Sequence, residues 1–416
     1  QKRGAVVGSS LNTAYLLERL SQTLERLETL MAIFVSNRYL PRRILLLTGC
    51  FARAAAERHS ISRLWKQSSG LMARSVTQNA GDHGEHYITR DKKEYWAMFY
   101  SAAGGGVLIA LMALFKTYLG SIIDDKVWKG IAEGLNYGLG FMVIFMLHFT
   151  VATKQPAMTA ARFAEAVEKT PQGKTVNMKL AQLLVDVFRS QSIAVLGNVL
   201  IAMGLAALIA FGYQYKTGEP LMNADQIAYQ LHSIDPFAGT LWFAAIAGVW
   251  LFCSGIISGY FDNRSNYLNM RMRLTQHPLL KKLMSEKTRV KFANYMHENY
   301  GSLIGNLCFG MLLGITGVVG YLTHLPLDIR HVAFSSANVG YIAVSGQFTY
   351  SLLLQCIGFV LLIGLVNLIV SFSLTLCVAL RSLNAEIESW WPIWHEVCQI
   401  VKKRPLSLFL PVQLDK

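Results

Sequence analysis

Apolar segments long enough to cross a membrane alternate with polar, basic segments along most of the chain. Each apolar segment is close to the ~20 residues that a transmembrane helix needs. Aromatic residues at several segment ends are typical of the membrane–water interface. The predicted spans are about 96–119, 135–152, 193–213, 241–260, 303–321 and 350–380. The pattern therefore predicts an all-α polytopic membrane helical bundle, with a transmembrane domain over 94–380.

Lysine and arginine are concentrated in four of the segments between and around these spans. Residues 1–93, 153–190, 262–300 and 381–416 hold 15, 6, 8 and 5 of them, whereas the three other connections hold 2, 1 and 1. Because lysine and arginine are retained on the cytoplasmic side, six crossings place all four rich segments there. We therefore predict a bacterial inner-membrane protein with both termini in the cytoplasm.

Small residues recur four positions apart inside the spans, a spacing that lets membrane helices approach closely. The pairs are Gly134 and Gly138, Gly255 and Gly259, Gly301 and Gly305, and Gly310 and Gly314. We expect these glycines to serve helix packing and not ligand binding.

The front region, residues 1–93, is polar and basic and contains one apolar helical stripe. Its apolar side chains recur at spacings of three and four, which predicts a helix with one buried face. The stripe consists of Leu17, Leu20, Leu24, Leu27, Met31 and Phe34. It belongs either to a packed helix in a cytoplasmic helical domain or to a dimerising coiled coil. Pro41 ends this helix, a second helix is expected over 42–75, and a loop over 79–84.

We expect the front region to be part of a longer N-terminal domain. Its residues 1–75 could bind a protein partner or a second copy of the chain. The tail, residues 381–416, is predicted to be cytoplasmic and amphipathic. The run 389–394 contains three tryptophans and precedes three consecutive basic residues at 402–404. This combination is typical of a helix on a membrane surface.

The composition agrees with membrane insertion and narrows the chemistry. Hydrophobic residues make up 53% of the chain and charged residues 15%, against about 25% charged in average soluble domains. The net charge of +14 would suit nucleic acid or an anionic membrane. Because the charge is concentrated on one predicted face, we expect membrane lipids as partners and not nucleic acid.

Metal, cofactor and nucleotide signals are weak. His83 with His86, and His395 with Cys398, have metal-like spacing but no further ligands nearby. No phosphate-binding glycine loop occurs, which argues against intrinsic NTP-driven pumping. The six cysteines are scattered singly and are expected to be reduced packing residues. We therefore predict no metal and no cofactor.

Two polar clusters lie next to spans on the predicted cytoplasmic side. Lys154 and Gln155 follow the second span, and Asp262, Asn263 and Arg264 end the fourth. Both clusters are candidate gates for a ligand. Simpler interpretations are an interfacial anchor for the first cluster and a helix cap with an ion pair for the second.

A third cluster joins spans five and six on the predicted outer side. Its polar residues fall within eleven positions and are Asp328, Arg330, His331, Ser335, Ser336 and Asn338. Ionisable groups at membrane depth are costly and usually functional. The segment is either a re-entrant element that lines a polar cavity with Asn306, or an ordered loop tied by an Asp328–Arg330 pair. In the first case Arg330 would bind an anionic group, and His331 would act as a proton-linked switch.

Three runs in these clusters resemble a known bacterial family. They are Lys154-Gln-Pro-Ala-Met-Thr159, Gly259-Tyr-Phe-Asp-Asn-Arg264 and Leu325-Pro-Leu-Asp-Ile-Arg-His-Val-Ala-Phe-Ser-Ser-Ala-Asn338, of which the third is the most specific. Over roughly residues 80–385 the chain is similar to polytopic membrane proteins labelled site-specific recombinase. The resemblance implies DNA cleavage and rejoining. The comparable cluster here would be Arg330, His331, Ser335, Ser336 and Tyr341.

Three functions are compatible with these features. The polar cluster at 328–338 favours a transporter, or a protein that handles lipid or a small molecule, without catalytic residues. The front region favours a non-catalytic membrane scaffold that recruits a partner. The resemblance implies a recombinase, which the predicted position of the cluster away from the cytoplasm disfavours. The substitution Arg330→Ala separates the first two, because only the transporter depends on this side chain.

Overall fold

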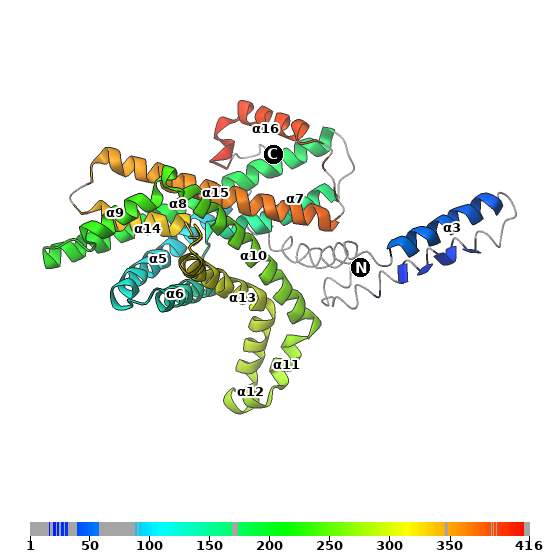
Figure 1. Ribbon diagram of the computed structural model, residues 1–416, viewed down its shortest axis with the longest axis horizontal. Coiled ribbons are helices and arrows are strands. Elements are labelled where there is room, and N and C mark those ends of the chain that lie inside the picture. Colours follow the sequence, from blue (N-terminus) through cyan, green and yellow to red (C-terminus); the bar gives the residue numbers. More distant parts are fainter. Residues whose placement is uncertain are drawn as a thin grey trace. The chain divides into compact units, whose positions relative to one another are not determined.

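Every described element of the structure is helical, as the apolar pattern predicts. The structure, a computed structural model, describes residues 40–57, 88–89, 91–168, 174–345, 348–383 and 389–411, with single positions between 16 and 31 and at 385 and 387. The chain divides into two compact units (Figure 1). Unit 1 contains Gln1–Ser75 and Asn263–Glu298, and unit 2 contains Val76–Asp262 and Asn299–Lys416.

Five helices in the described part of the chain are long and apolar enough to cross a membrane. They correspond to the first, third, fourth, fifth and sixth predicted spans. They are α5 (Lys92–Ile122), α8 (Lys174–Thr217), α10 (Thr240–Tyr267), α13 (Glu286–Thr323) and α15 (Tyr350–Leu383). The protein therefore has the elements of a polytopic helical membrane protein.

The predicted second span coincides only partly with a helix. α6 runs over Lys126–Met146, so it begins nine residues before the expected span, and residues 147–151 are not helical. Asp125 fixes its start, because this carboxylate accepts hydrogen bonds from N–H groups of the first helical turn. His148, with a φ of 58°, turns the chain beyond its end. α6 is not among the five long apolar helices, and its crossing stays a prediction.

Shorter helices connect the long ones. α7 (Gln155–Glu168) precedes α8, and α9 (Ala224–Ile234) lies between α8 and α10. α14 (Val332–Ala343) lies between α13 and α15, and α16 (Trp391–Lys403) follows α15. In unit 1, α11 (Met270–Gln276) and α12 (Pro278–Leu283) connect α10 to α13. 3₁₀ turns cover Ala152–Lys154, Pro236–Ala238 and Pro405–Leu408.

Unit 1 also contains α3 (Leu40–Glu57). Pro41 lies in its first turn, where a missing N–H group has no helical partner to lose. In the preceding stripe, Leu20, Leu24, Leu27 and Met31 are more than half exposed. A partner for this stripe stays a prediction. Leu17, Phe34, positions 58–75 of the expected second helix and the loop at 79–84 lie outside the described residues.

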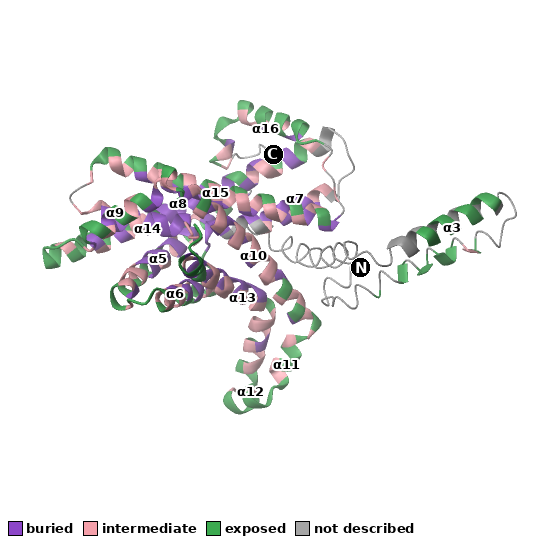
Figure 2. Cartoon of the chain, viewed as in Figure 1, coloured by how far each residue is buried: buried purple, intermediate pink, exposed green. Residues whose placement is uncertain are grey.

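The core of unit 2 forms around α14. Figure 2 shows buried residues gathered where α14 lies against α5 and α8. Ten of the 12 residues of α14 are buried, and the Tyr341 hydroxyl donates to the carbonyl oxygen of Ala110 in α5 at 2.8 Å. The connection between the fifth and sixth predicted spans is therefore not a loop throughout. It is a non-helical segment followed by a buried helix.

Glycines bring α6 and α13 together backbone to backbone. Gly310 faces Gly138, and Gly314 faces Gly134, so closely that a Cβ atom at either α13 position would overlap the main chain of α6. Such contact is typical of small residues spaced four apart in membrane helices. Their predicted packing role is confirmed.

α16 uses its apolar side to pack on the rest of unit 2. Ile393 and Val397 are buried in a cluster with side chains of α7, α8 and α15. Trp391 and Trp394 are exposed on the other side. The predicted amphipathic helix therefore exists, but its buried face contacts protein, and only the exposed tryptophans remain for lipid.

Candidate functional site

The segment 324–331, between α13 and α14, carries the first of two ion pairs. Arg330 Nη1 lies 2.6 Å from Asp328 Oδ2 and donates to the carbonyl oxygen of Ile329 at 2.8 Å. Arg330 Nε donates to the carbonyl oxygen of Ser233, at the end of α9, at 2.8 Å. The guanidinium group also lies over the Phe243 ring of α10, 5.4 Å from its centroid. The predicted Asp328–Arg330 pair is confirmed, and α9 and α10 fix its position.

Asn367 of α15 ties the same segment to the start of α14. Its Oδ1 accepts from the Val332 N–H at 3.1 Å, while its Nδ2 donates to the carbonyl oxygens of Arg330 (3.0 Å) and Ala244 (2.7 Å). His331, the N-cap residue of α14, makes no side-chain cap. Asn367 therefore satisfies one of the first N–H groups of α14 from a different helix.

His331 is enclosed by polar and aromatic neighbours. Its Nε2 lies 2.7 Å from Thr153 Oγ1, in the 3₁₀ turn that follows α6. The rings of Phe141, Phe309 and Phe334 lie 6.1, 5.8 and 5.6 Å from the imidazole centroid. The side chain is buried. His331 therefore joins segment 324–331 to the chain after α6, and its proposed proton-linked role stays a prediction.

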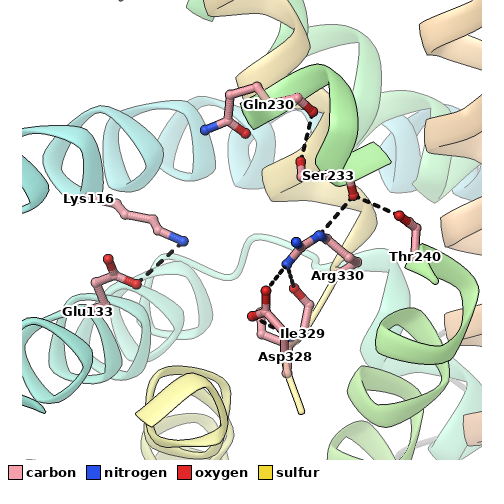
Figure 3. A network of polar contacts seen from close by, with 8 residues as sticks. All are labelled: Lys116, Glu133, Gln230, Ser233, Thr240, Asp328, Ile329 and Arg330. Carbon is pink, nitrogen blue, oxygen red and sulfur yellow. Dashed lines mark hydrogen bonds and ion pairs between the residues drawn. The ribbon is translucent and has the colours of Figure 1, made fainter. Parts of the chain in front are cut away.

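A second ion pair lies near the first. Lys116 Nζ of α5 is 3.4 Å from Glu133 Oε2 of α6, and the ammonium group lies 5.6 Å from the centroid of the Tyr137 ring. Figure 3 shows Lys116 reaching toward the place where Asp328 and Arg330 meet. Side chains from α5, α6 and segment 324–331 therefore gather four charges in one region. We call these four residues the charged cluster.

Each ion pair has one open and one enclosed member. The side chains of Lys116 and Asp328 are 38% and 37% exposed, whereas those of Glu133 and Arg330 are 14% exposed each. The enclosed Arg330 is also held in place by the Ser233 carbonyl oxygen. The cluster is thus partly open to a ligand and internally braced.

The other polar residues of the predicted third cluster belong to α14. Ser335 and Ser336 are buried and Asn338 is half-buried. The Ser336 hydroxyl donates to the carbonyl oxygen of Ala333 at 2.7 Å. A serine that bonds its own helix in this way is a common arrangement in membrane helices. The hydrogen bond given for the Ser336 hydroxyl is therefore within α14 and not to the charged cluster, and the predicted binding role of Ser336 stays a prediction.

Asn306 and Asp262 take part in helix contacts. Asn306 is buried and donates to the carbonyl oxygen of Ser302, one turn earlier in α13, at 2.7 Å. Asp262 Oδ1 accepts from the Gly301 N–H at 2.9 Å and so joins α10 to α13. Gly301 lies 22 residues before the end of α13, which is about 33 Å along the helix. Asp262 is therefore well separated from segment 324–331.

The remaining predicted gate residues lie at the start of the second part of unit 1 and in the chain from the end of α6 to the start of α7. Asn263 is half-buried and Arg264 is exposed, and both belong to unit 1. The backbone of Lys154 ends the 3₁₀ turn after α6, and Gln155 begins α7. The side chains of these two residues lie outside the described residues. Their gating roles stay predictions.

Sequence reasoning missed Glu133, Asn198 and Asn367. Glu133 is the one acidic residue of α6. Asn198, buried in α8, donates to the carbonyl oxygens of Ala102 and Thr150 and accepts from the Ala152 N–H. An isolated carboxylate or amide inside an apolar run is costly without a partner, and this signal could have found all three.

A separate polar cluster holds the tail on α8. Arg189, which is buried, donates to the carbonyl oxygens of Thr89 at 2.5 Å and Ser407 at 3.4 Å. It also pairs with Asp186 at 2.9 Å. The Tyr95 hydroxyl donates to the carbonyl oxygen of Phe409 at 2.8 Å. These bonds link the start of α5, the middle of α8 and the tail, which is a structural role.

The family described as site-specific recombinase matches residues 1–411. No curated protein and no solved structure matches the chain. The family match includes the front region and the tail, so it extends beyond the part in which the three sequence runs resemble the family. The chain belongs to the family described as site-specific recombinase.

Proposed function

We propose that the protein is a membrane transport or lipid-handling protein whose ligand binds through an anionic group at the charged cluster. The observation that carries this proposal is that the Arg330 guanidinium group is only partly used in hydrogen bonds. Its Nε and Nη1 are used by Ser233, Asp328 and Ile329, whereas Nη2 has no hydrogen-bond partner within the described part of the chain. Lys116 adds a second, more open cation nearby. Two such donors suit a phosphate or carboxylate.

The expected membrane position supports an entry site at this place. We propose a bacterial inner-membrane location with both termini in the cytoplasm, on the basis of the lysine and arginine distribution. The charged cluster then lies toward the outer side, because segment 324–331 follows α13 and because Lys116 and Glu133 lie within about two helical turns of the α5–α6 connection. Three exposed aromatic residues, Tyr118 of α5, Trp128 of α6 and Trp242 of α10, are of the kind that is typical of a membrane–water interface.

A scaffold is the second candidate, favoured by the exposed stripe of the front region. Leu20, Leu24, Leu27 and Met31 present apolar side chains at helical spacing to solvent. A stripe of this kind suits a partner helix or a second copy of the chain. The scaffold would need no ligand at the charged cluster.

DNA cleavage and rejoining, which the family description names, is less favoured by the geometry. A nucleophile must reach a phosphodiester, yet Ser335, Ser336 and Tyr341 are all buried in α14. The Tyr341 hydroxyl is also used as a donor to α5. Recombination would require α14 to leave the core of unit 2.

Flux measurements in proteoliposomes test the proposal. The purified chain is reconstituted, and two rates are measured: transfer of a fluorescent phospholipid between leaflets and release of trapped glycerol phosphate. We expect one rate to exceed that of protein-free liposomes and to fall about tenfold or more in Arg330→Gln, because charge-assisted hydrogen bonds are lost. Asp124→Asn, which neutralises an exposed charge in the α5–α6 turn, is the matched control and should keep the rate.

If neither rate rises with the wild-type chain, the transport proposal is wrong and the scaffold becomes the better candidate. Assembly is checked in every variant by size-exclusion chromatography. A variant that assembles normally but has lost flux identifies Arg330 as a ligand contact and not only a structural residue.

A further inference from the structure

We infer that the ligand of the charged cluster is zwitterionic, with its anionic group on Lys116 and Arg330 and its cationic group on Asp328. This inference rests on the proposed function and narrows the class of ligand. It follows from the signs of the four charges, the exposure of their side chains and the hydrogen bonds that hold them.

The signs of the four charges disfavour a simple anion. Lys116 and Arg330 are cations, and Glu133 and Asp328 are carboxylates, so the cluster has no net charge. An anion that approached the two cations would also approach two carboxylates, which oppose it. A ligand that carries both signs can satisfy a cation and a carboxylate together.

The exposure of the side chains indicates which charges meet the ligand. The open members of the two pairs are Lys116, at 38%, and Asp328, at 37%. They have opposite signs and come from different segments. The two side chains most open to a ligand are therefore an ammonium group and a carboxylate, and Glu133 pairs with Lys116 as its less exposed partner.

The hydrogen bonds within the cluster leave some donors and acceptors available on the groups that would face the ligand. Asp328 Oδ1 accepts from the Ile329 N–H at 2.8 Å, and Oδ2 accepts from Arg330. A carboxylate offers about four acceptor positions, so an amine on the ligand can still be bound. Arg330 keeps its Nη2 donors, and Lys116 has three donors, of which one serves Glu133 and one the Tyr137 side chain. Because Arg330 is held by Ser233, the Asp328 carboxylate is already oriented before binding.

Two sources share this chemistry. One is the headgroup of a membrane lipid that carries a phosphate and an amine, and the other is a small water-soluble zwitterion. Trp242 is exposed, and its Nε1 donates to the carbonyl oxygen of Pro326, in segment 324–331, at 3.1 Å. Because tryptophan is typical of the membrane–water interface, this contact is compatible with a lipid headgroup near the segment. The two sources are separated by experiment.

Calorimetric titration of the purified full chain with matched probes tests the inference. O-Phosphoethanolamine carries both charges, whereas ethyl phosphate lacks the amine and ethanolamine lacks the phosphate. We expect phosphoethanolamine to bind at least tenfold more tightly than either of the others. Asp328→Asn should abolish this preference for phosphoethanolamine over ethyl phosphate, while Asp124→Asn should retain it. Lys116→Gln should weaken both phosphates and provides a second variant if Asp328→Asn does not fold.

The lipid source is tested in nanodiscs of phosphatidylethanolamine or phosphatidylglycerol with identical acyl chains. Native mass spectrometry after extraction counts the lipids that stay bound, and retention of phosphatidylethanolamine that Asp328→Asn removes supports a headgroup site. Equal affinity of the wild type for ethyl phosphate and phosphoethanolamine, without selective lipid retention, overturns the zwitterion but keeps the proposed anion site. If no phosphate probe and no lipid binds, the proposed function fails together with the inference.

Discussion

Asn367 connects three main-chain segments through one buried amide. It bonds to the carbonyl oxygens of Ala244 and Arg330 and to the N–H of Val332, in three different parts of unit 2. The charged cluster depends on this amide, because the same bonds fix where segment 324–331 ends and α14 begins. An asparagine in an apolar helix is therefore a positioning residue for the cluster.

Asn367→Leu should lower the free energy of unfolding by about 2 kcal/mol, since hydrogen bonds between membrane helices contribute roughly 0.6 kcal/mol each on average. The measurement is reversible unfolding of the purified protein in detergent. Gln355→Leu, at an exposed amide of the same helix, is the control and should change stability little. Equal effects of the two substitutions would contradict the role given to Asn367.

Residue-scale features differ in how far the sequence reveals them. The Asp328–Arg330 pair could be predicted, because its partners are two positions apart. The sequence does not indicate the pairing of Lys116 with Glu133, since they belong to different helices and only packing brings them together. It marks His331 as an unusual ionisable residue, but the contact of His331 with Thr153 joins residues 178 positions apart. Sequence patterns identify costly polar groups more readily than the partners that compensate for them.

At the scale of elements, the contact between α6 and α13 relies on the absence of side chains. Gly310→Ala places a methyl group against the main chain of Gly138, so the two helices must separate. We expect a loss of stability of about 1–3 kcal/mol, the usual cost of overpacking. Gly204→Ala in α8, where a Cβ atom meets nothing within 4 Å, is the matched control. It should be neutral or stabilising by up to about 1 kcal/mol, because alanine favours the helix.

α16 provides a second element-scale prediction. Ile393 is buried against the other helices, so Ile393→Asp should detach α16 and let its backbone unfold at the exposed basic residues 402–404. Trypsin should then cut the tail of the reconstituted protein about tenfold faster, because cleavage follows local opening. Cys398→Asp introduces the same charge at an exposed position of the helix and should leave the rate unchanged. If both variants are cut at the wild-type rate, Ile393 does not hold the tail.

Periodicity and hydropathy predicted which segments become long helices but not where each ends. α6 begins at a capping aspartate, whereas the first N–H group of α14 is bonded by Asn367, a residue of another helix. For segment 325–340 the sequence is compatible with both a loop and a re-entrant element, because a short apolar run is ambiguous until its surroundings are known. In the structure this segment is a non-helical stretch followed by a helix.

At the scale of the whole molecule, α6 decides the membrane topology. Its 21 residues span about 31 Å, close to the ~30 Å of the bilayer hydrocarbon. Glu133 is its one acidic residue and is paired with Lys116, which lowers the cost of placing it in a membrane. With α6 as a sixth crossing, the four lysine- and arginine-rich segments all lie on the same side of the membrane. With only five crossings, residues 153–190, 262–300 and 381–416 would lie on the side opposite the front region.

Single cysteines in a cysteine-depleted background distinguish these topologies. With six crossings, a membrane-impermeant thiol reagent added to intact cells should label Asp124→Cys and Tyr215→Cys, while Trp391→Cys should react only after the membrane is opened. All three positions are exposed in the folded chain. Ser336→Cys should react from neither side, because the side chain is buried in α14. If α6 does not cross, position 215 moves inside and position 391 outside while position 124 stays outside, so the pattern of the three reactions identifies the number of crossings.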